Sequence, residues 1–208
     1  TYSTPIFETS LANFTINKAK QFIACSYDGY VIGDGILFYL DKDKLLYVGR
    51  APSANWIQFQ AETGGYNVNI VKDDRSPGNP KGNAVIRKCY RFQVQGPKAK
   101  HVLERLNGGP IPDVKFFTMD TINIAGRKVP CLRHGMAGAP GLEVWGPYEQ
   151  REEIREAIIA AGKDFGIINE SADWNPLQNR SHARREGSFF RSHHFVTRLE
   201  ALRRQNIP

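Results

Sequence analysis

Residues 132–147, LRHGMAGAPGLEVWGP, combine a glycine-rich turn with a short apolar strand that carries one carboxylate, Glu143. Glycine at this density lets the backbone turn sharply and approach another surface closely. Neighbouring residues of a strand point to opposite faces, so Glu143 points away from Leu142 and Val144. Two interpretations stay open: a solvated Glu on an edge strand, or a carboxylate at the mouth of a pocket that accepts hydrogen bonds from a ligand.

A second copy of this pattern lies upstream. The segment FQVQGPKAKHVLERL recurs as LEVWGPYEQREEIREAI with an offset of 50 residues. Each copy reads as a strand, a Gly-Pro pair and a helix, and the two units fall near 84–106 and 128–162. The sequence therefore predicts an α+β fold of mainly antiparallel sheets with packed helices.

The first third of the chain reads as a β-meander followed by a helix. Further strands and helices alternate up to Gly162. Ser53 is the expected N-cap of the first helix. The expected strands are 20–26, 31–40 (interrupted by the glycines around Asp34), 44–50, 66–71, 84–95, 115–119, 121–125 and 128–132; the expected helices are 52–63, 98–106 and 147–162.

The composition changes after about residue 168. Residues 169–208 contain seven Arg and no Lys, whereas residues 1–168 contain twelve Lys and nine Arg. We therefore expect one domain over 1–168 and a basic, Arg-rich, loosely ordered tail over 169–208. The His193-His194 pair in the tail has no acidic or Cys partners at ligand spacing and reads as solvated rather than metal-binding.

Charge and cysteine usage narrow the class of protein. The net charge of +7 is spread along the chain, which favours anionic small molecules over a dedicated nucleic-acid partner. Cys25, Cys89 and Cys131 share no metal-ligand spacing, so no metal is expected, and Cys25 and Cys131 read as buried thiols of a cytoplasmic protein. No apolar run is long enough to span a membrane. The oligomeric state is left open.

Five separated motifs together carry a family resemblance: VIGDGILFYL at 31–40, YVGRAP at 47–52, GGYNV at 64–68, FQVQGPKA at 92–99 and the stretch at 132–147. In this order and spacing they resemble the folate-binding domain of the aminomethyltransferase (glycine-cleavage T-protein) superfamily. The resemblance is greatest to the tetrahydrofolate-dependent O-demethylases of vanillate, syringate or 3-O-methylgallate, and it covers roughly residues 18–168. It implies a T-protein-type fold and transfer of a methyl group from a methoxylated aromatic acid to N5 of tetrahydrofolate.

The resemblance also implies roles for four residues. Asp34 matches a catalytic acid near the folate amine, and Glu143 matches the Glu that hydrogen-bonds the pterin. Arg50 matches an Arg that pairs with the aromatic carboxylate, and Val48 lines the pterin pocket. The residue types suit these roles, because a carboxylate can accept two adjacent N–H groups and a guanidinium forms a planar fork for a benzoate.

Other interpretations remain. From the residues alone, Asp34 fits a turn within a hairpin and Arg50 fits a solvated strand end. The family's Tyr after the position of Gly166 has no counterpart, because residues 166–208 contain no Tyr. The alternatives are therefore a folate-binding or regulatory module without turnover, an aminomethyltransferase of glycine-cleavage type, or a basic nucleic-acid binder.

Overall fold

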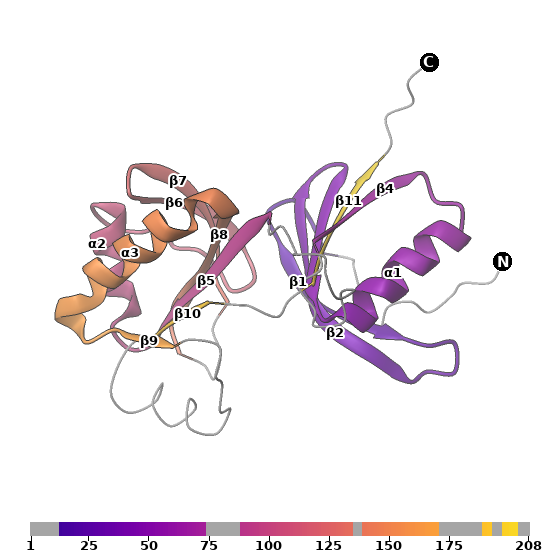
Figure 1. The fold of residues 1–208 in the computed structure, drawn as a ribbon, viewed down its shortest axis with the longest axis horizontal. Coiled ribbons are helices and arrows are strands. Elements are labelled where there is room, and N and C mark those ends of the chain that lie inside the picture. Colours follow the sequence, from indigo (N-terminus) through magenta and orange to yellow (C-terminus); the bar gives the residue numbers. More distant parts are fainter. Residues whose placement is uncertain (1–12, 74–87, 135–138, 171–188, 193–196, 204–208) are drawn as a thin grey trace, which may run out of the picture. The chain divides into compact units, whose positions relative to one another are not determined.

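The computed structural model describes residues 13–73, 88–134, 139–170, 189–192 and 197–203. The chain forms two compact units (Figure 1). Unit 1 comprises residues 1–86 and 195–208, and unit 2 comprises residues 87–194. The sequence predicts a single domain over 1–168, and this range contributes strands to both sheets.

Unit 1 is an antiparallel five-stranded sheet with one helix on one face (Figure 1). The helix α1 (Ala51–Thr63) follows directly on the third strand, as expected for a meander that leads into a helix. The strands, in sheet order, are β1 (Ala19–Cys25), β2 (Val31–Asp41), β3 (Lys44–Gly49), β11 (Thr197–Arg203) and β4 (Val68–Asp73).

Two local expectations in unit 1 are wrong. Strand β2 continues through Gly33, Asp34 and Gly35, because each of them pairs with a residue of β1, and the register shifts only between Gly33 and Val31. Ser53 is not the N-cap of α1: the helix begins at Ala51, its N-cap is Arg50, and no side chain caps it. The Ser53 hydroxyl instead lies 3.3 Å from the carbonyl oxygen of Arg50 and donates to it.

The segment expected to be a loosely ordered tail contributes strands to both sheets. Strand β11 lies between β3 and β4 and pairs with both in antiparallel register. Strand β10 (Phe189–Ser192) pairs with β5 (Cys89–Gln95) in unit 2. Main-chain hydrogen bonds to neighbouring strands therefore order these two parts of the tail. The His193-His194 pair lies outside the described residues.

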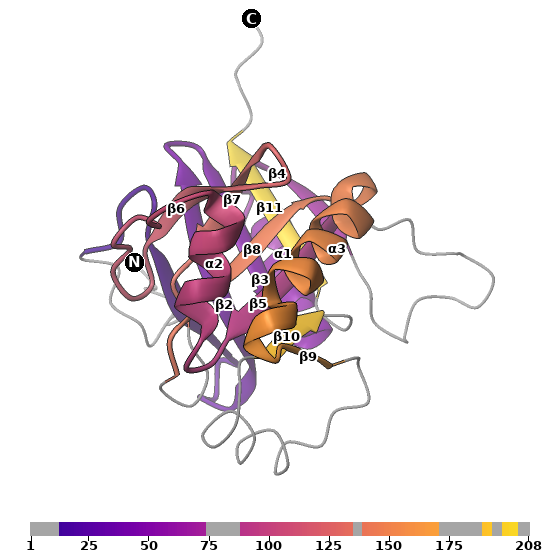
Figure 2. The same ribbon diagram turned by 90° about the vertical axis from the view of Figure 1, so that its left-hand side faces the viewer.

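Unit 2 is a six-stranded sheet whose strands are antiparallel except for β9 and β10. Strand β5 leads into α2 (Ala99–Asn107), and β8 leads through η2 (Tyr148–Gln150) into α3 (Arg151–Gly162), which ends in η3 (Lys163–Phe165). Figure 2 shows α2 and α3 side by side across the sheet. The strands, in sheet order, are β6 (Met119–Ile124), β7 (Arg127–Leu132), β8 (Gly141–Pro147), β5, β10 and β9 (Ile168–Glu170).

The predicted α+β class of mainly antiparallel sheets with packed helices is confirmed. The strand expected at 115–119 is wrong, since residues 111–117 form no strand and β6 begins at Met119. Among the described residues, no helix is long and apolar enough to cross a membrane.

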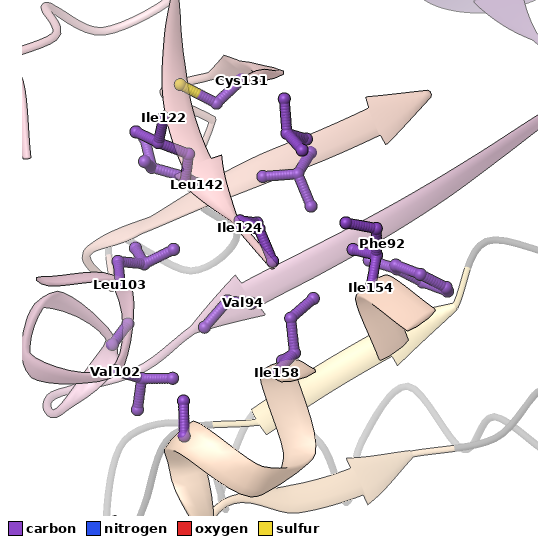
Figure 3. Close-up of a cluster of buried hydrophobic side chains, with 14 of the residues drawn as sticks. Phe92, Val94, Val102, Leu103, Ile122, Ile124, Cys131, Leu142, Ile154 and Ile158 are labelled. Atoms are coloured by element: carbon purple, nitrogen blue, oxygen red, sulfur yellow. The ribbon is translucent and has the colours of Figure 1, made fainter. Parts of the chain in front are cut away.

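The core of unit 2 lies between the sheet and its two helices (Figure 3). Phe92 and Val94 of β5 face Ile154 and Ile158 of α3, and every one of these side chains is at most 4% exposed. Cys131 is fully buried in the same core, and this burial raises the pKa of its thiol to about 12. The thiol stays protonated at neutral pH and serves as a packing group. Cys25 and Cys89 are also buried and free. The prediction that Cys25 and Cys131 are buried thiols is therefore confirmed.

Candidate functional site

Three of the four predicted site residues lie at one end of the β2–β3 pair in unit 1. Gly35 of β2 pairs with Gly49 of β3. Because the two strands are antiparallel, Asp34, which precedes Gly35, and Arg50, which follows Gly49, lie at the same end of the pair. Val48 pairs with Ile36 and shares with Asp34 the sheet face opposite Gly33 and Gly35. Asp34 and Arg50 are exposed, whereas Val48 is buried. The structure therefore gathers a carboxylate, a guanidinium and an apolar side chain.

Arg50 stands where β3 passes into α1. Its backbone is extended, with φ −79° and ψ 156°, and its carbonyl oxygen accepts the first hydrogen bond of the helix from the amide of Ala54. Pro52 in the first helical turn fixes the direction in which the helix leaves. Asp34 is held from the neighbouring strand, because Gln21 Nε2 donates to its Oδ2 at 3.4 Å.

Glu143, the fourth predicted residue, lies on β8 in unit 2 and is only 1% exposed. The interpretation as a solvated Glu is therefore wrong. Its carboxylate forms a buried ion pair with Arg91 of β5, whose Nε and Nη2 both contact Glu143 Oε1. Arg91 is opposite Trp145 in the register, so it reaches Glu143 diagonally across the two strands.

Gln93 extends this polar face of the sheet. It pairs directly with Glu143 across β5 and β8. Its Nε2 donates to the carbonyl oxygen of His134 at 2.6 Å, while its buried Oε1 has no hydrogen-bond partner among the described residues. His134 Nδ1 lies 3.7 Å from Glu143 Oε2. A buried amide oxygen without a donor is costly, and a ligand N–H would satisfy it.

Arg91 and Gln93 are the residues that our sequence reasoning missed. The alternation in CYRFQVQ places both on the face opposite Tyr90, Phe92 and Val94, which is one usable signal. The internal repeat is another, because its offset of 50 residues makes Gln93 the counterpart of Glu143. The two copies of the strand thus put an amide and a carboxylate side by side.

A separate cavity of about 310 Å³ opens in unit 2 between α2, residues 111–114 and the start of β8. Leu103 and Leu142 of the core line it, with Lys100 and Arg133 among its charged residues. None of the four predicted site residues lines this cavity.

The two groups of residues can recognise complementary chemistry. In unit 1, Arg50 offers a planar cation for a carboxylate, with Asp34 at the adjacent register position. In unit 2, Glu143 and the Gln93 oxygen are adjacent acceptors for N–H groups of a planar ring. These acceptors suit the 2-amino-4-oxopterin edge, which presents neighbouring N–H donors.

Comparison with known proteins identifies the family to which the chain belongs. The fold and the two groups of residues define a class of protein. It is an α+β chain that carries polar side chains on the sheet face opposite its helices. The GCVT N-terminal domain matches residues 5–173, which span both units. This chain belongs to that family, and the predicted membership of the aminomethyltransferase superfamily with its T-protein-type fold is confirmed.

Three relatives illustrate the range of the family. A syringate O-demethylase of Sphingobium sp. (strain NBRC 103272 / SYK-6) is 47% identical over 158 residues, which cover 76% of this chain and 34% of that protein. An aminomethyltransferase of Thermoanaerobacter pseudethanolicus is 28% identical, covering 78% of this chain and 42% of that protein. A sesamin methylene transferase of Sinomonas sp. is 27% identical, covering 82% and 34%. The chain thus spans between a third and a half of the length of these relatives.

Proposed function

We propose that this chain supplies the folate-binding domain of a tetrahydrofolate-dependent O-demethylase. The domain includes residues 1–168 together with the strands β10 and β11 of its sheets. It acts on a methoxylated aromatic acid, whose methyl group passes to N5 of tetrahydrofolate. The identity of 47% to a syringate O-demethylase supports the reaction class. The observation that supports tetrahydrofolate as the cofactor is the pair of buried hydrogen-bond acceptors, Glu143 and Gln93, which lie side by side on one sheet face.

The residues of unit 2 fit the pterin ring of a folate. Glu143 accepts N–H groups from the pyrimidine edge, and Gln93 Oε1 gains the donor that it lacks. Arg91 compensates the charge of the buried carboxylate. When bound, tetrahydrofolate supplies the amine that accepts the methyl group. The cofactor is thus held by charge-assisted hydrogen bonds.

The residues of unit 1 bind the aromatic acid and contribute to the folate pocket. Arg50 pairs with the carboxylate of the aromatic acid, and Val48 lines the pterin pocket. Asp34 would accept the proton that the folate amine N5 loses as its lone pair bonds to the methyl carbon. Breaking the methyl–oxygen bond leaves its electron pair on the phenolate oxygen, which then needs a proton. Holding the reactants in line can contribute on the order of 7–11 kcal/mol to lowering the barrier.

Removing the Glu143 carboxylate is expected to weaken tetrahydrofolate binding by a factor of ten or more, because charged hydrogen bonds to the pterin are lost, at about 1.5–3 kcal/mol each. Calorimetric titration of tetrahydrofolate into the wild type, Glu143→Ala and Glu143→Gln measures this effect. Glu143→Gln keeps the size of the side chain, and circular dichroism confirms folding. Equal heats for wild type and folded variants would remove the pterin role of Glu143.

The role of Arg50 is tested by the choice of ligand. Vanillate is expected to bind at least fivefold more tightly than vanillyl alcohol, because only the acid offers a carboxylate to the guanidinium. Arg50→Met is expected to abolish this preference while leaving the affinity for vanillyl alcohol unchanged. A wild type that binds both compounds equally would argue against carboxylate pairing at Arg50.

A second candidate function is folate binding without turnover. It is favoured by the absence of Tyr from residues 166–208, where the family supplies the proton donor for the phenolate. Incubation of the chain with tetrahydrofolate and a panel of methoxybenzoates distinguishes the two candidates. Formation of methyltetrahydrofolate would exclude the binding module, and ligand binding without any methyltetrahydrofolate would support it.

The cellular setting follows from the same proposal. We place the protein in the cytoplasm, since its three cysteines are buried and free rather than paired in disulfides. Small methoxylated aromatic acids, being anions, suit its positive net charge of +7.

A further inference from the structure

The Tyr47 hydroxyl joins the two strand ends that carry Asp34 and Arg50. Tyr47 lies on β3, is 2% exposed and packs edge-on against Phe22. Its hydroxyl lies 3.0 Å from the carbonyl oxygen of Asp34 and 2.8 Å from Ser53 Oγ, and its single proton is donated to one of these two acceptors at a time. Ser53 Oγ in turn lies 3.3 Å from the carbonyl oxygen of Arg50. Two buried hydroxyls therefore connect the peptide groups of Asp34 and Arg50.

The glycines around Asp34 make room for these hydroxyls. A Cβ atom on Gly35 would lie 2.5 Å from the Tyr47 hydroxyl, and one on Gly33 would lie 2.7 Å from Ser53 Oγ. A Cβ on Gly49 would also collide with the Tyr47 hydroxyl. The glycines of the VIGDG motif thus leave space for the Tyr47 and Ser53 hydroxyls on the α1 side of the sheet.

The side chain of Asp34 points to the other face. Successive residues of a strand alternate, so Asp34 lies opposite Gly33 and Gly35 and therefore opposite the Tyr47 hydroxyl. Burial raises the pKa of Tyr47, which keeps its phenol protonated, and the sheet separates that phenol from the face of Asp34. Tyr47 is therefore not the missing proton donor for the phenolate.

We propose that Tyr47 and Ser53 are positioning residues for the aromatic-acid site. Their hydroxyls hold the backbones of Asp34 and Arg50 at a fixed separation, from the face opposite the substrate. Because the junction between β3 and α1 is already ordered, binding of a carboxylate to the Arg50 guanidinium does not have to offset the entropy cost of ordering it. This inference rests on the proposed function, in which Asp34 and Arg50 contact the substrate.

Tyr47→Phe tests the inference, because it removes the hydroxyl and keeps the buried ring. We expect vanillate to bind about five- to tenfold more weakly, in line with the loss of one buried hydrogen-bond network. The preference for vanillate over vanillyl alcohol should shrink by the same factor. Tetrahydrofolate affinity should remain unchanged, because Glu143 and Gln93 are untouched. Calorimetric titration of the three ligands provides these values.

Two further variants separate positioning from general destabilisation. Tyr39→Phe is the matched control, since the Tyr39 hydroxyl reaches only the carbonyl oxygen of Lys42 at 3.5 Å among the described residues, and it should leave all three affinities unchanged. Ser53→Ala should reproduce Tyr47→Phe, and the double variant should be no weaker than either single one. A purely structural role would lower stability in urea without changing the ratio of acid to alcohol affinity.

The outcomes are distinct. If wild type binds the ligands and Tyr47→Phe keeps the full preference for the acid, the positioning role is wrong and the proposed function stands. If wild type binds neither vanillate nor tetrahydrofolate, the proposed function fails and the positioning role fails with it. A selective loss of the acid preference in Tyr47→Phe and Ser53→Ala supports both.

Discussion

Replacing Arg91 by methionine is expected to lower the free energy of unfolding by about 3–5 kcal/mol, because it strands the carboxylate of Glu143 without its cation. The Arg91 side chain is 10% exposed and that of Glu143 only 1%, so water cannot compensate the loss. Urea denaturation at neutral pH, followed by circular dichroism, measures the difference. This effect concerns the fold alone and is independent of any ligand.

Two controls define the result. The double variant Arg91→Met/Glu143→Leu is expected to recover most of the loss, since replacing both members of a buried pair by apolar groups is often neutral. Arg127→Met removes a comparable pair with Glu153 at 2.8 Å whose side chains are each 46% exposed, and it should cost less than about 1 kcal/mol. Equal losses for Arg91→Met and Arg127→Met would show that burial of the Glu143 pair has no energetic consequence.

Truncating Ile158 to alanine is expected to lower the free energy of unfolding by about 2–5 kcal/mol. Ile158 is fully buried where α3 meets Phe92 and Val94 of β5 (Figure 3), so the variant leaves a cavity in the packed core. The same denaturation experiment measures the change, with the slope of the transition compared to confirm that the folded state is intact.

Ile159 provides the matched control on the same helix. It has the same side chain, lies next along α3 and is only partly buried. Ile159→Ala should therefore cost clearly less than Ile158→Ala, because fewer contacts are lost and less cavity remains. A larger loss at Ile159 would mean that the helix packs on the sheet through its other face.

The strands and helices of the core were accessible to sequence reasoning, because alternation and the repeated Gly-Pro units are local signals. The partner of Glu143 was not, since it depends on the register between β5 and β8. A shift by one residue would turn Glu143 to the opposite face of its strand. The burial of Glu143 and its pairing with Arg91 are therefore tertiary facts, even though the repeat already related Gln93 to Glu143.

The errors in unit 1 have the same origin. Ser53 has the residue type of an N-cap, but β3 enters α1 at Arg50 and carries Ser53 into the first turn, where its hydroxyl bonds to a carbonyl group. Residues 197–203 belong to the tail that was expected to be loosely ordered, yet they form β11, because this segment hydrogen-bonds to β3 on one side and to β4 on the other. Neither the start of α1 at the end of β3 nor the position of β11 between β3 and β4 can be predicted from the local sequence.

The crystal structure of the chain with tetrahydrofolate and vanillate bound tests the central claim most directly. We expect the pterin edge within hydrogen-bond distance of Glu143 and Gln93, and the vanillate carboxylate on Arg50 with Asp34 beside it. A pterin bound away from Glu143, or a vanillate bound away from Arg50, would contradict it.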